Sequence, residues 1–149
     1  MIRKARITDV KQIQKLVEVF ANKGEMLPRS LSELYDNLRD FYVYEENGVL
    51  AGVCALHICW DDLAEVRSLV VAERHIKKGM GKKLVTACVD EAKEFGIKRV
   101  FALTYQRVFF EKLGFHEIDK TQLPHKIWGD CLKCSKFPEC DEIAMVLEL

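Results

Sequence analysis

The chain of 149 residues is 49% hydrophobic and 31% charged, and its 23 basic residues are balanced by 23 acidic ones. This length and composition predict one globular domain, residues 1–149, and exclude a disordered chain. The absence of a basic excess argues against a general nucleic-acid binder, and no apolar run approaches the ~20 residues that span a bilayer. The first six residues, Met-Ile-Arg-Lys-Ala-Arg, lack the apolar stretch of a signal peptide, which indicates a cytoplasmic protein.

The first half of the chain shows strand and helix patterns followed by a hairpin. A capping box at residues 30–33 predicts the start of a second helix, with Leu34, Leu38 and Phe41 on its apolar face. The Asn-Gly pair at residues 47–48 is a strong hairpin signal between two β-type runs. The predicted elements are a strand at residues 2–7, a helix from residue 10 to the stop at Gly24, a helix from residue 31, and strands at 41–44 and 49–60.

The second half of the chain alternates strands and helices, which is typical of crossover connections. The predicted elements are a strand at 65–71, a helix at 84–95, a strand at 99–103, a helix at 108–113, a strand at 115–118, an irregular segment at 119–142 and a strand at 143–147. The order β-α-α-β-β-β-α-β-α-β-β implies an α/β (α+β) fold. We expect one mixed, mostly antiparallel central sheet with helices on both faces.

Two glycines, Gly79 and Gly81, lie between the predicted strand at 65–71 and the long helix that follows. Glycine lets a ligand approach the backbone closely, and the N–H groups in the first turn of a helix point toward negative charge. Four lysines flank these glycines and add positive charge: Lys77, Lys78, Lys82 and Lys83. The pattern indicates an anion-binding loop, and the alternative is a tight turn with a solvated basic rim.

The element order and two short motifs resemble the GNAT acyltransferase family. Residues 76–81 match its signature, Arg/Gln-x-x-Gly-x-Gly/Ala, and residues 110–115 match its Tyr-Glu-Lys-Leu-Gly-Phe-like string. Within the family, the chain is most similar to the acetyltransferase domain of bacterial N-acetylglutamate synthases in its short, single-domain form. The matching strings are residues 2–5, 29–30, 65–68, 103–104 and 123–124.

This resemblance implies an acetyl-coenzyme A-dependent amino-acid N-acetyltransferase. The expected acceptor is the α-amine of L-glutamate or L-glutamine, and the expected reaction is the first step of arginine biosynthesis. Another GNAT activity is the first alternative, with a protein N-terminus, a lysine or a small amine as acceptor. The resemblance leaves a homodimer open, and we expect neither a nucleic-acid nor a membrane partner.

Two residues depart from the family pattern. Ile76 takes the usual Arg or Gln position, so one side-chain contact to the coenzyme is missing. Phe110 takes the position of the Tyr that reprotonates the departing thiolate in many members, and a phenyl ring cannot donate a proton. These departures keep open a second alternative, a non-catalytic acyl-coenzyme A-binding sensor.

The resemblance places acetyl-coenzyme A on the glycine loop. Its pyrophosphate is expected on the backbone amides of the loop, and its pantetheine arm is expected alongside the preceding strand like an extra strand. The residues expected to bind the coenzyme are Leu69, Val70, Val71, Lys77, Lys78, Gly79, Met80, Gly81 and Lys82.

Glu65 is the candidate general base, since similar synthases carry a glutamate at this point of the strand and a carboxylate can accept the proton of the amine. Its alternative role is an ordinary charge at a strand start. Tyr105 is the candidate proton donor in place of Phe110. The candidates for binding the acceptor are Arg29, Arg67, Ser68, Arg107 and Lys126, because arginine suits carboxylates, although several of these charges could simply be solvated. Ser68 would lie on the other side of the strand from Arg67 unless a bulge intervenes.

Three of the six cysteines, Cys131, Cys134 and Cys140, have spacing compatible with metal ligands. His125 or Asp141 could complete four ligands to a structural zinc. A redox pair and three reduced thiols are the alternatives, and our expectation is that no metal is bound here. The surrounding segment is then expected to be a loop over the substrate, where specificity is commonly set. The remaining cysteines, Cys54, Cys59 and Cys88, are expected to act as small apolar residues.

Overall fold

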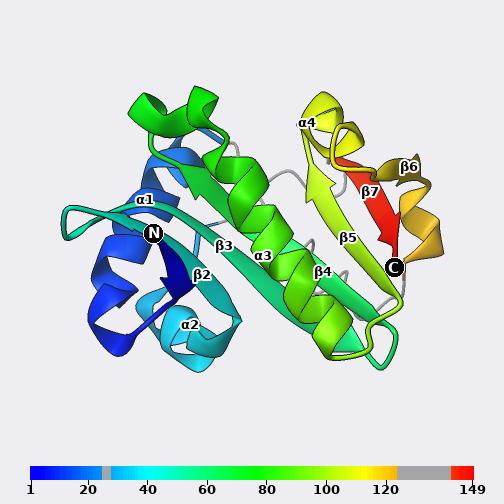
Figure 1. The fold of residues 1–149 in the computed structure, drawn as a ribbon, viewed down its shortest axis with the longest axis horizontal. Coiled ribbons are helices and arrows are strands. Elements are labelled where there is room, and N and C mark those ends of the chain that lie inside the picture. The colour runs from blue at the N-terminus through cyan, green and yellow to red at the C-terminus, as the bar shows by residue number, and fades with distance from the viewer. Residues whose placement is uncertain (25–27, 124–141) are drawn as a thin grey trace. The chain divides into compact units, whose positions relative to one another are not determined.

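The computed structural model describes residues 1–24, 28–123 and 142–149. Over these residues, seven strands form one mixed sheet in the order β1-β2-β3-β4-β5-β7-β6 (Figure 1). The β4–β5 pair is parallel, whereas the β1–β2, β2–β3, β5–β7 and β6–β7 pairs are antiparallel. The predicted α/β class and its mostly antiparallel sheet are confirmed. None of the described helices is long and apolar enough to cross a membrane.

The chain divides into two compact units, and the first contains Met1–His57 and Val66–Glu91. Its elements are β1 (Ile2–Lys4), η1 (Ile7–Asp9), α1 (Val10–Asn22), α2 (Leu31–Asp36), η2 (Leu38–Asp40), β2 (Phe41–Glu46), most of β3 (Val49–Trp60), the later part of β4 (Leu63–Val71), η3 (Glu73–Lys78) and most of α3 (Met80–Glu94). One apolar core joins α1 and α2 to a single face of β2 and β3 through Ile13, Leu34, Val43 and Val53, among others. These residues place α1 and α2 on the same face of the unit.

Helix α3 packs on the opposite face of the first unit. A Cβ atom added to Gly52 of β3 would lie 3.0 Å from Cδ1 of Leu84 in α3, so the missing side chain allows the helix to approach. Gly52 alternates with Val53 along the strand, and successive residues of a strand point to opposite faces. Helices therefore cover both faces of the sheet in this unit, as the sequence predicted.

The second unit contains Ile58–Glu65 and Ala92–Leu149. Besides the ends of β3 and α3 and the start of β4, its described residues form five further elements: β5 (Arg99–Thr104), α4 (Arg107–Glu111), β6 (His116–Ile118), η4 (Lys120–Gln122) and β7 (Ile143–Glu148). β5 pairs in parallel with the start of β4 and antiparallel with β7. Its buried core includes Cys59, Leu63, Phe101, Ala144 and Val146. The unit is thus built on a central β5 with a neighbour on each edge.

Local geometry confirms the predicted hairpin and corrects two helix boundaries. Asn47 and Gly48 have φ values of 52° and 78°, the positive pair that a type I′ turn requires. The second helix ends at Asp36, because Phe41 begins β2 and pairs with Ala55 instead of continuing the helical face. Helix α3 begins at Met80, earlier than predicted, since the left-handed Gly79 directly precedes it.

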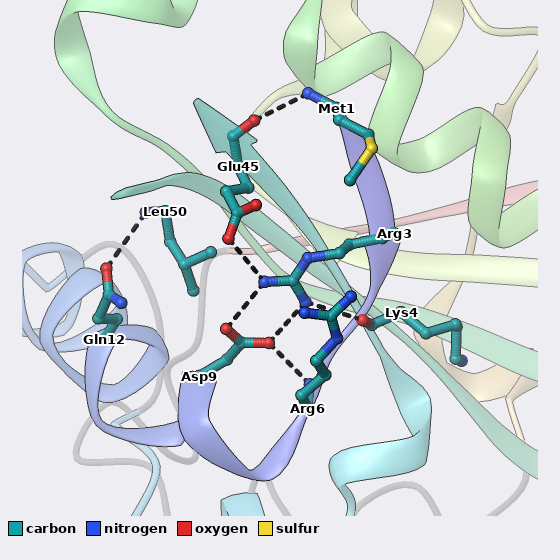
Figure 2. A network of polar contacts seen from close by, with 8 residues as sticks. All are labelled: Met1, Arg3, Lys4, Arg6, Asp9, Gln12, Glu45 and Leu50. Atoms are coloured by element: carbon teal, nitrogen blue, oxygen red, sulfur yellow. Dashed lines mark hydrogen bonds and ion pairs between the residues drawn. The ribbon is translucent and has the colours of Figure 1, made fainter. Parts of the chain in front are cut away.

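A buried ion pair ties the N-terminus of the first unit together (Figure 2). Arg3 donates to both carboxylate oxygens of Asp9, at 2.8 and 3.0 Å, and to Glu45 Oε2 at 2.9 Å. The Arg6 N–H also donates to Asp9 Oδ2, at 2.7 Å. Asp9 is only 4% exposed, and the hydrogen bond from Arg3 holds its pKa below the ordinary value of 3.8. The Arg3 guanidinium of β1 therefore joins Glu45 of β2 to Asp9, the residue directly before α1.

Replacing Asp9 by Asn should lower the free energy of unfolding by about 3 kcal/mol, because Arg3 would lose its buried charged partner and keep only the more exposed Glu45. In the unfolded chain the Asp9 carboxyl takes up its proton near pH 3.8, whereas in the folded chain it does so at lower pH. The pair therefore stabilises the fold above pH 3.8, and this contribution disappears as the pH falls through the folded pKa.

Urea unfolding between about pH 5 and about pH 2 tests this, with the wild-type protein losing more stability than Asp9→Asn as the pH falls. Asp90→Asn, at an exposed position of α3, is the control and should change the free energy by less than about 0.5 kcal/mol. Equal acid sensitivity of Asp9→Asn and the wild-type protein would show that Asp9 is not a stabilising charge.

Candidate coenzyme and acyl-transfer residues

The segment after β4 forms a tight turn in the first unit. β4 ends at Val71, and the next residue, Ala72, donates its N–H to Ala51 O of β3 at 2.8 Å. η3 follows, and Gly79 then adopts the left-handed conformation, with φ 78° and ψ 13°. Helix α3 starts at the next residue. Only glycine takes this backbone conformation without a steric cost, which explains why it stands at this point.

The start of α3 offers backbone donors to an anion. The first helical hydrogen bond runs from Lys83 N–H to Gly79 O at 3.1 Å, so the N–H groups of Met80, Gly81 and Lys82 lie ahead of it in the first turn. A Cβ atom added to Gly79 would meet nothing within 4 Å, which leaves its backbone open to a ligand. Lys78, Lys82 and Lys83 are exposed around these amides. This geometry suits a diphosphate group.

The other residues expected to contact the coenzyme are Lys77 and three residues of β4, namely Leu69, Val70 and Val71. Lys77 lies in η3, and its side chain is outside the described part of the structure. Of the strand residues, Val70 is 1% exposed and packs in the core of the first unit, while Leu69 and Val71 are half-buried. Alternation along the strand therefore turns Leu69 and Val71 to the face opposite Val70.

Ser68 is the most unusual residue of β4. Its φ of 56° departs from the extended backbone of the surrounding strand, and such an irregularity is the condition under which the sequence allowed Ser68 to leave the face opposite Arg67. The residue is 8% exposed, and within the described part of the chain its Oγ has no hydrogen-bond partner. A buried hydroxyl without a partner costs free energy, so Ser68 is a good position for contact with a bound molecule.

Glu65 lies inside β4, where it is 9% exposed and stands opposite Phe101 in the parallel pairing with β5. Tyr105 directly follows β5 and is 37% exposed. The turn after it is shaped by a hydrogen bond from Gln106 N–H to Thr104 Oγ1 at 2.9 Å. Glu65 thus lies on one strand of the second unit, and Tyr105 directly follows the neighbouring strand.

The candidate cations differ in their surroundings. The Arg29 side chain is 12% exposed and lies 3.4 Å from Glu33 Oε2, whereas Arg67 is half-buried on β4. Arg107 is exposed on α4 and pairs with Glu117 Oε1 of β6 at 2.5 Å. Lys126 lies outside the described residues. Arg29 therefore resembles a positioned binding residue more than Arg107 does.

Phe110 is a packing residue of the second unit. It is 3% exposed, and its ring makes edge contacts with Phe109 at 5.0 Å and with Phe115 at 5.1 Å between centroids. Its position in an aromatic cluster explains why an apolar ring replaces the usual tyrosine. Any proton delivered to a leaving group must come from another residue or from water.

The cysteines fall into two groups. Cys54, Cys59 and Cys88 are buried free thiols, as predicted, and the Cys54 and Cys88 Sγ atoms lie 3.7 Å apart between β3 and α3. Contact with Cys88 and burial raise the pKa of the Cys54 thiol, which keeps it protonated and unreactive. Cys131, Cys134 and Cys140, with His125 and Asp141, lie outside the described residues. Among the residues that are described, no cluster suited to a metal ion occurs.

Sequence reasoning missed one group next to the glycine turn, namely Tyr44, Glu46 and His75. His75 lies in η3 and is 2% exposed, and the Tyr44 ring meets it edge-on. The available signal was the spacing of Tyr44 and Glu46, which places both on one face of β2. Nothing in the sequence indicated that His75 would pack against them.

Comparison with known proteins identifies the class. Residues 9–115 match the model of the Acetyltransferase (GNAT) family, and the chain belongs to this family. It is therefore an acetyltransferase by family, and the glycine turn between β4 and α3 is its candidate phosphate-binding position.

Two relatives and one solved structure are informative. An uncharacterized N-acetyltransferase of Chlorobaculum tepidum is 41% identical, with 99% of this chain and 96% of that protein covered. An amino-acid acetyltransferase of Mycobacterium tuberculosis is 33% identical, with coverage of 87% and 76%. N-acetylglutamate synthase from Neisseria gonorrhoeae, solved with coenzyme A and N-acetyl-glutamate, is 27% identical with a TM-score of 0.90; the match covers 100% of this chain and 35% of that one.

Gly79→Ala should weaken coenzyme A binding by about tenfold or more, because it strains the turn and places a methyl group where the ligand approaches. Gly96→Ala is a matched control, since Gly96 has the same φ of 78° and the same open surroundings but lies beyond the end of α3. Both variants should lose about 1 kcal/mol of stability from backbone strain. Calorimetric titration measures the affinity of each variant for coenzyme A. Equal affinities of the two variants would argue against the turn as the binding position.

Proposed function

We propose that this acetyltransferase transfers the acetyl group of acetyl-coenzyme A to the α-amine of L-glutamate or L-glutamine. It would then catalyse the first step of arginine biosynthesis, in the cytoplasm. The observation that carries the proposal is the presence of two buried polar side chains on β4. They are the carboxylate of Glu65 and the hydroxyl of Ser68, which has no hydrogen-bond partner among the described residues. An amino-acid acceptor is suggested by the name of the Mycobacterium tuberculosis relative, and glutamate in particular by the N-acetyl-glutamate in the Neisseria structure.

The coenzyme would be held mainly by the backbone. The amides of Met80, Gly81 and Lys82 would donate to the pyrophosphate, and the exposed lysines around them would add charge. Because these contacts are made by the main chain, Ile76 in place of Arg or Gln removes one side-chain contact and leaves the amides intact. The pantetheine arm would run along the half-buried Leu69 and Val71.

Bound acetyl-coenzyme A supplies a thioester whose C–S bond breaks as the C–N bond of the product forms. Glu65 would accept the proton that the ammonium group must lose, directly or through water. Tyr105 would donate a proton to the departing sulfur, since its partly exposed phenol follows β5 and Phe110 has no proton to give. The nitrogen would lose a second proton as the amide forms; its transfer to the Tyr105 phenolate, and release of the first proton from Glu65 to water, would balance the reaction and restore both residues.

The acceptor's carboxylate requires a cation. Arg29 is our first assignment, because its side chain is largely buried whereas that of Arg107 is exposed, although each of them pairs with a glutamate. Arg67 and Lys126 are retained as further contacts. Ser68 Oγ would donate a hydrogen bond to the acceptor, which would satisfy a hydroxyl that the described chain leaves unpaired.

The direct test is release of free coenzyme A from acetyl-coenzyme A across a panel of amino acids, amines and peptides. Turnover with glutamate or glutamine alone is the expected result. Preference for a peptide N-terminus, a lysine or a small amine would replace the proposed acceptor by another one. Tight binding of acetyl-coenzyme A without turnover on any amine would instead favour the non-catalytic sensor.

Glu65→Gln should reduce kcat by about 100-fold or more, because the amide has nearly the same shape but cannot accept the proton. The affinity for coenzyme A should stay within about twofold of wild type, since Glu65 has no part in phosphate binding. Steady-state kinetics over a range of pH checks both values. Wild-type turnover by Glu65→Gln at every pH would remove Glu65 as the base.

Ser68→Ala should separate activity from stability. Loss of an unpartnered buried hydroxyl should leave the protein as stable as wild type or raise its free energy of unfolding by about 1 kcal/mol, while KM for the acceptor should rise. Ser30→Ala is the stability control. The Ser30 hydroxyl accepts from Glu33 N–H at 3.1 Å, so that variant should lose about 1 kcal/mol. Destabilisation by Ser68→Ala with an unchanged KM would indicate a structural role.

A further inference from the structure

A buried histidine lies directly before the glycine turn, on the same face of the first unit as α3. His75 is in η3, the segment that leads into Gly79, and its side chain is 2% exposed. Tyr44 of β2 stands opposite Gly52 in the hairpin, and Gly52 is the residue on which Leu84 of α3 packs. The Tyr44 side chain, which contacts His75 of η3, therefore projects from the same face of the sheet as α3.

Three side chains form a connected group at this position. The rings of Tyr44 and His75 meet edge-on, with centroids 5.8 Å apart and an angle of 67° between planes. Tyr44 Oη donates to Glu46 Oε2 at 2.9 Å, and this oxygen lies 3.7 Å from His75 Nδ1. The hydrogen bond to the Glu46 carboxylate raises the pKa of Tyr44, so the phenol stays a donor. Two residues of β2 thus hold one residue of η3.

The backbone around His75 links this contact to the position of the glycine turn. His75 N–H donates to Ala72 O at 2.8 Å, and Ala72 N–H is bonded to Ala51 O of β3. η3 is a single short 3-10 helix, a structure with poorer hydrogen bonds than an α-helix, and it depends on packing for its position. Any shift of η3 would move Lys78, Gly79 and the first amides of α3, which follow it without a break.

We propose that Tyr44, Glu46 and His75 form a positioning cluster that presets the phosphate-binding turn for the coenzyme. The three residues act through the backbone of η3 and set the affinity for acetyl-coenzyme A, with little effect on the transfer step. Preorganised amides bind an anion more tightly, because less ordering is needed when it arrives. This inference rests on the coenzyme-binding part of the proposed function and is independent of the acceptor.

The test compares variants of the cluster by calorimetric titration with coenzyme A and by steady-state kinetics. His75→Ala should raise the Kd for coenzyme A and the KM for acetyl-coenzyme A by about tenfold, with kcat at saturation within about threefold of wild type. His75→Phe keeps the ring contact with Tyr44 and should fall between wild type and His75→Ala. Glu46→Gln keeps an acceptor for Tyr44 Oη but loses the charge near His75, and should raise the Kd by about threefold.

Lys23→Gln is the matched control. Lys23 Nζ pairs with Glu73 of the same η3 at 3.3 Å, but both side chains are exposed, and exposed pairs contribute little. Its Kd should stay within about twofold of wild type.

A wild-type protein that does not bind coenzyme A would refute the proposed function itself. Wild-type binding together with unchanged Kd values in folded His75→Phe and Glu46→Gln would refute the positioning cluster alone. A fall in kcat at unchanged KM would also contradict it, because the effect would then lie in the transfer step.

Discussion

The left-handed backbone of Gly79 is the constraint on which the first unit depends. It ends η3 and starts α3 in one residue, so it completes the reversal of chain direction between β4 and α3. The reversal lets α3 lie back on the sheet, with Leu84 against Gly52 and Cys88 against Cys54. The same reversal places the N–H groups of Met80, Gly81 and Lys82 ahead of the first helical hydrogen bond. Packing of the helix and the proposed binding of an anion thus both depend on one glycine.

β4 carries a second unusual backbone position before that turn. Among the described residues other than glycine, only Asn47 and Ser68 have positive φ. Asn47 is explained by its hairpin, whereas Ser68 lies within a strand, where such a conformation costs of order 1–3 kcal/mol and persists mainly where function requires it. Because its hydroxyl is also buried without a described partner, the strain and the unpaired donor point to the same role in substrate binding.

Much of the fold could be predicted because its signals are local. Asn47-Gly48 marks a hairpin by its own backbone preference, and Gly79 marks the turn before α3. The end of α2 could not be predicted, since the helical spacing of Phe41 was overridden by its pairing with Ala55 in β3. Contacts between distant segments could not be predicted either. The pairing of Arg3 with Glu45 and the packing of His75 on Tyr44 depend on strand register, and a single sequence does not reveal that register.

The central claim is that the turn at Gly79 binds the pyrophosphate of the coenzyme through the first amides of α3. Backbone amide NMR spectra during titration with coenzyme A, and separately with pantetheine, which has no phosphate groups, test it most directly. We predict that the amide resonances of Met80, Gly81 and Lys82 shift strongly with coenzyme A and little with pantetheine. Equal shifts with both ligands, or shifts with coenzyme A confined to other elements, would contradict the account.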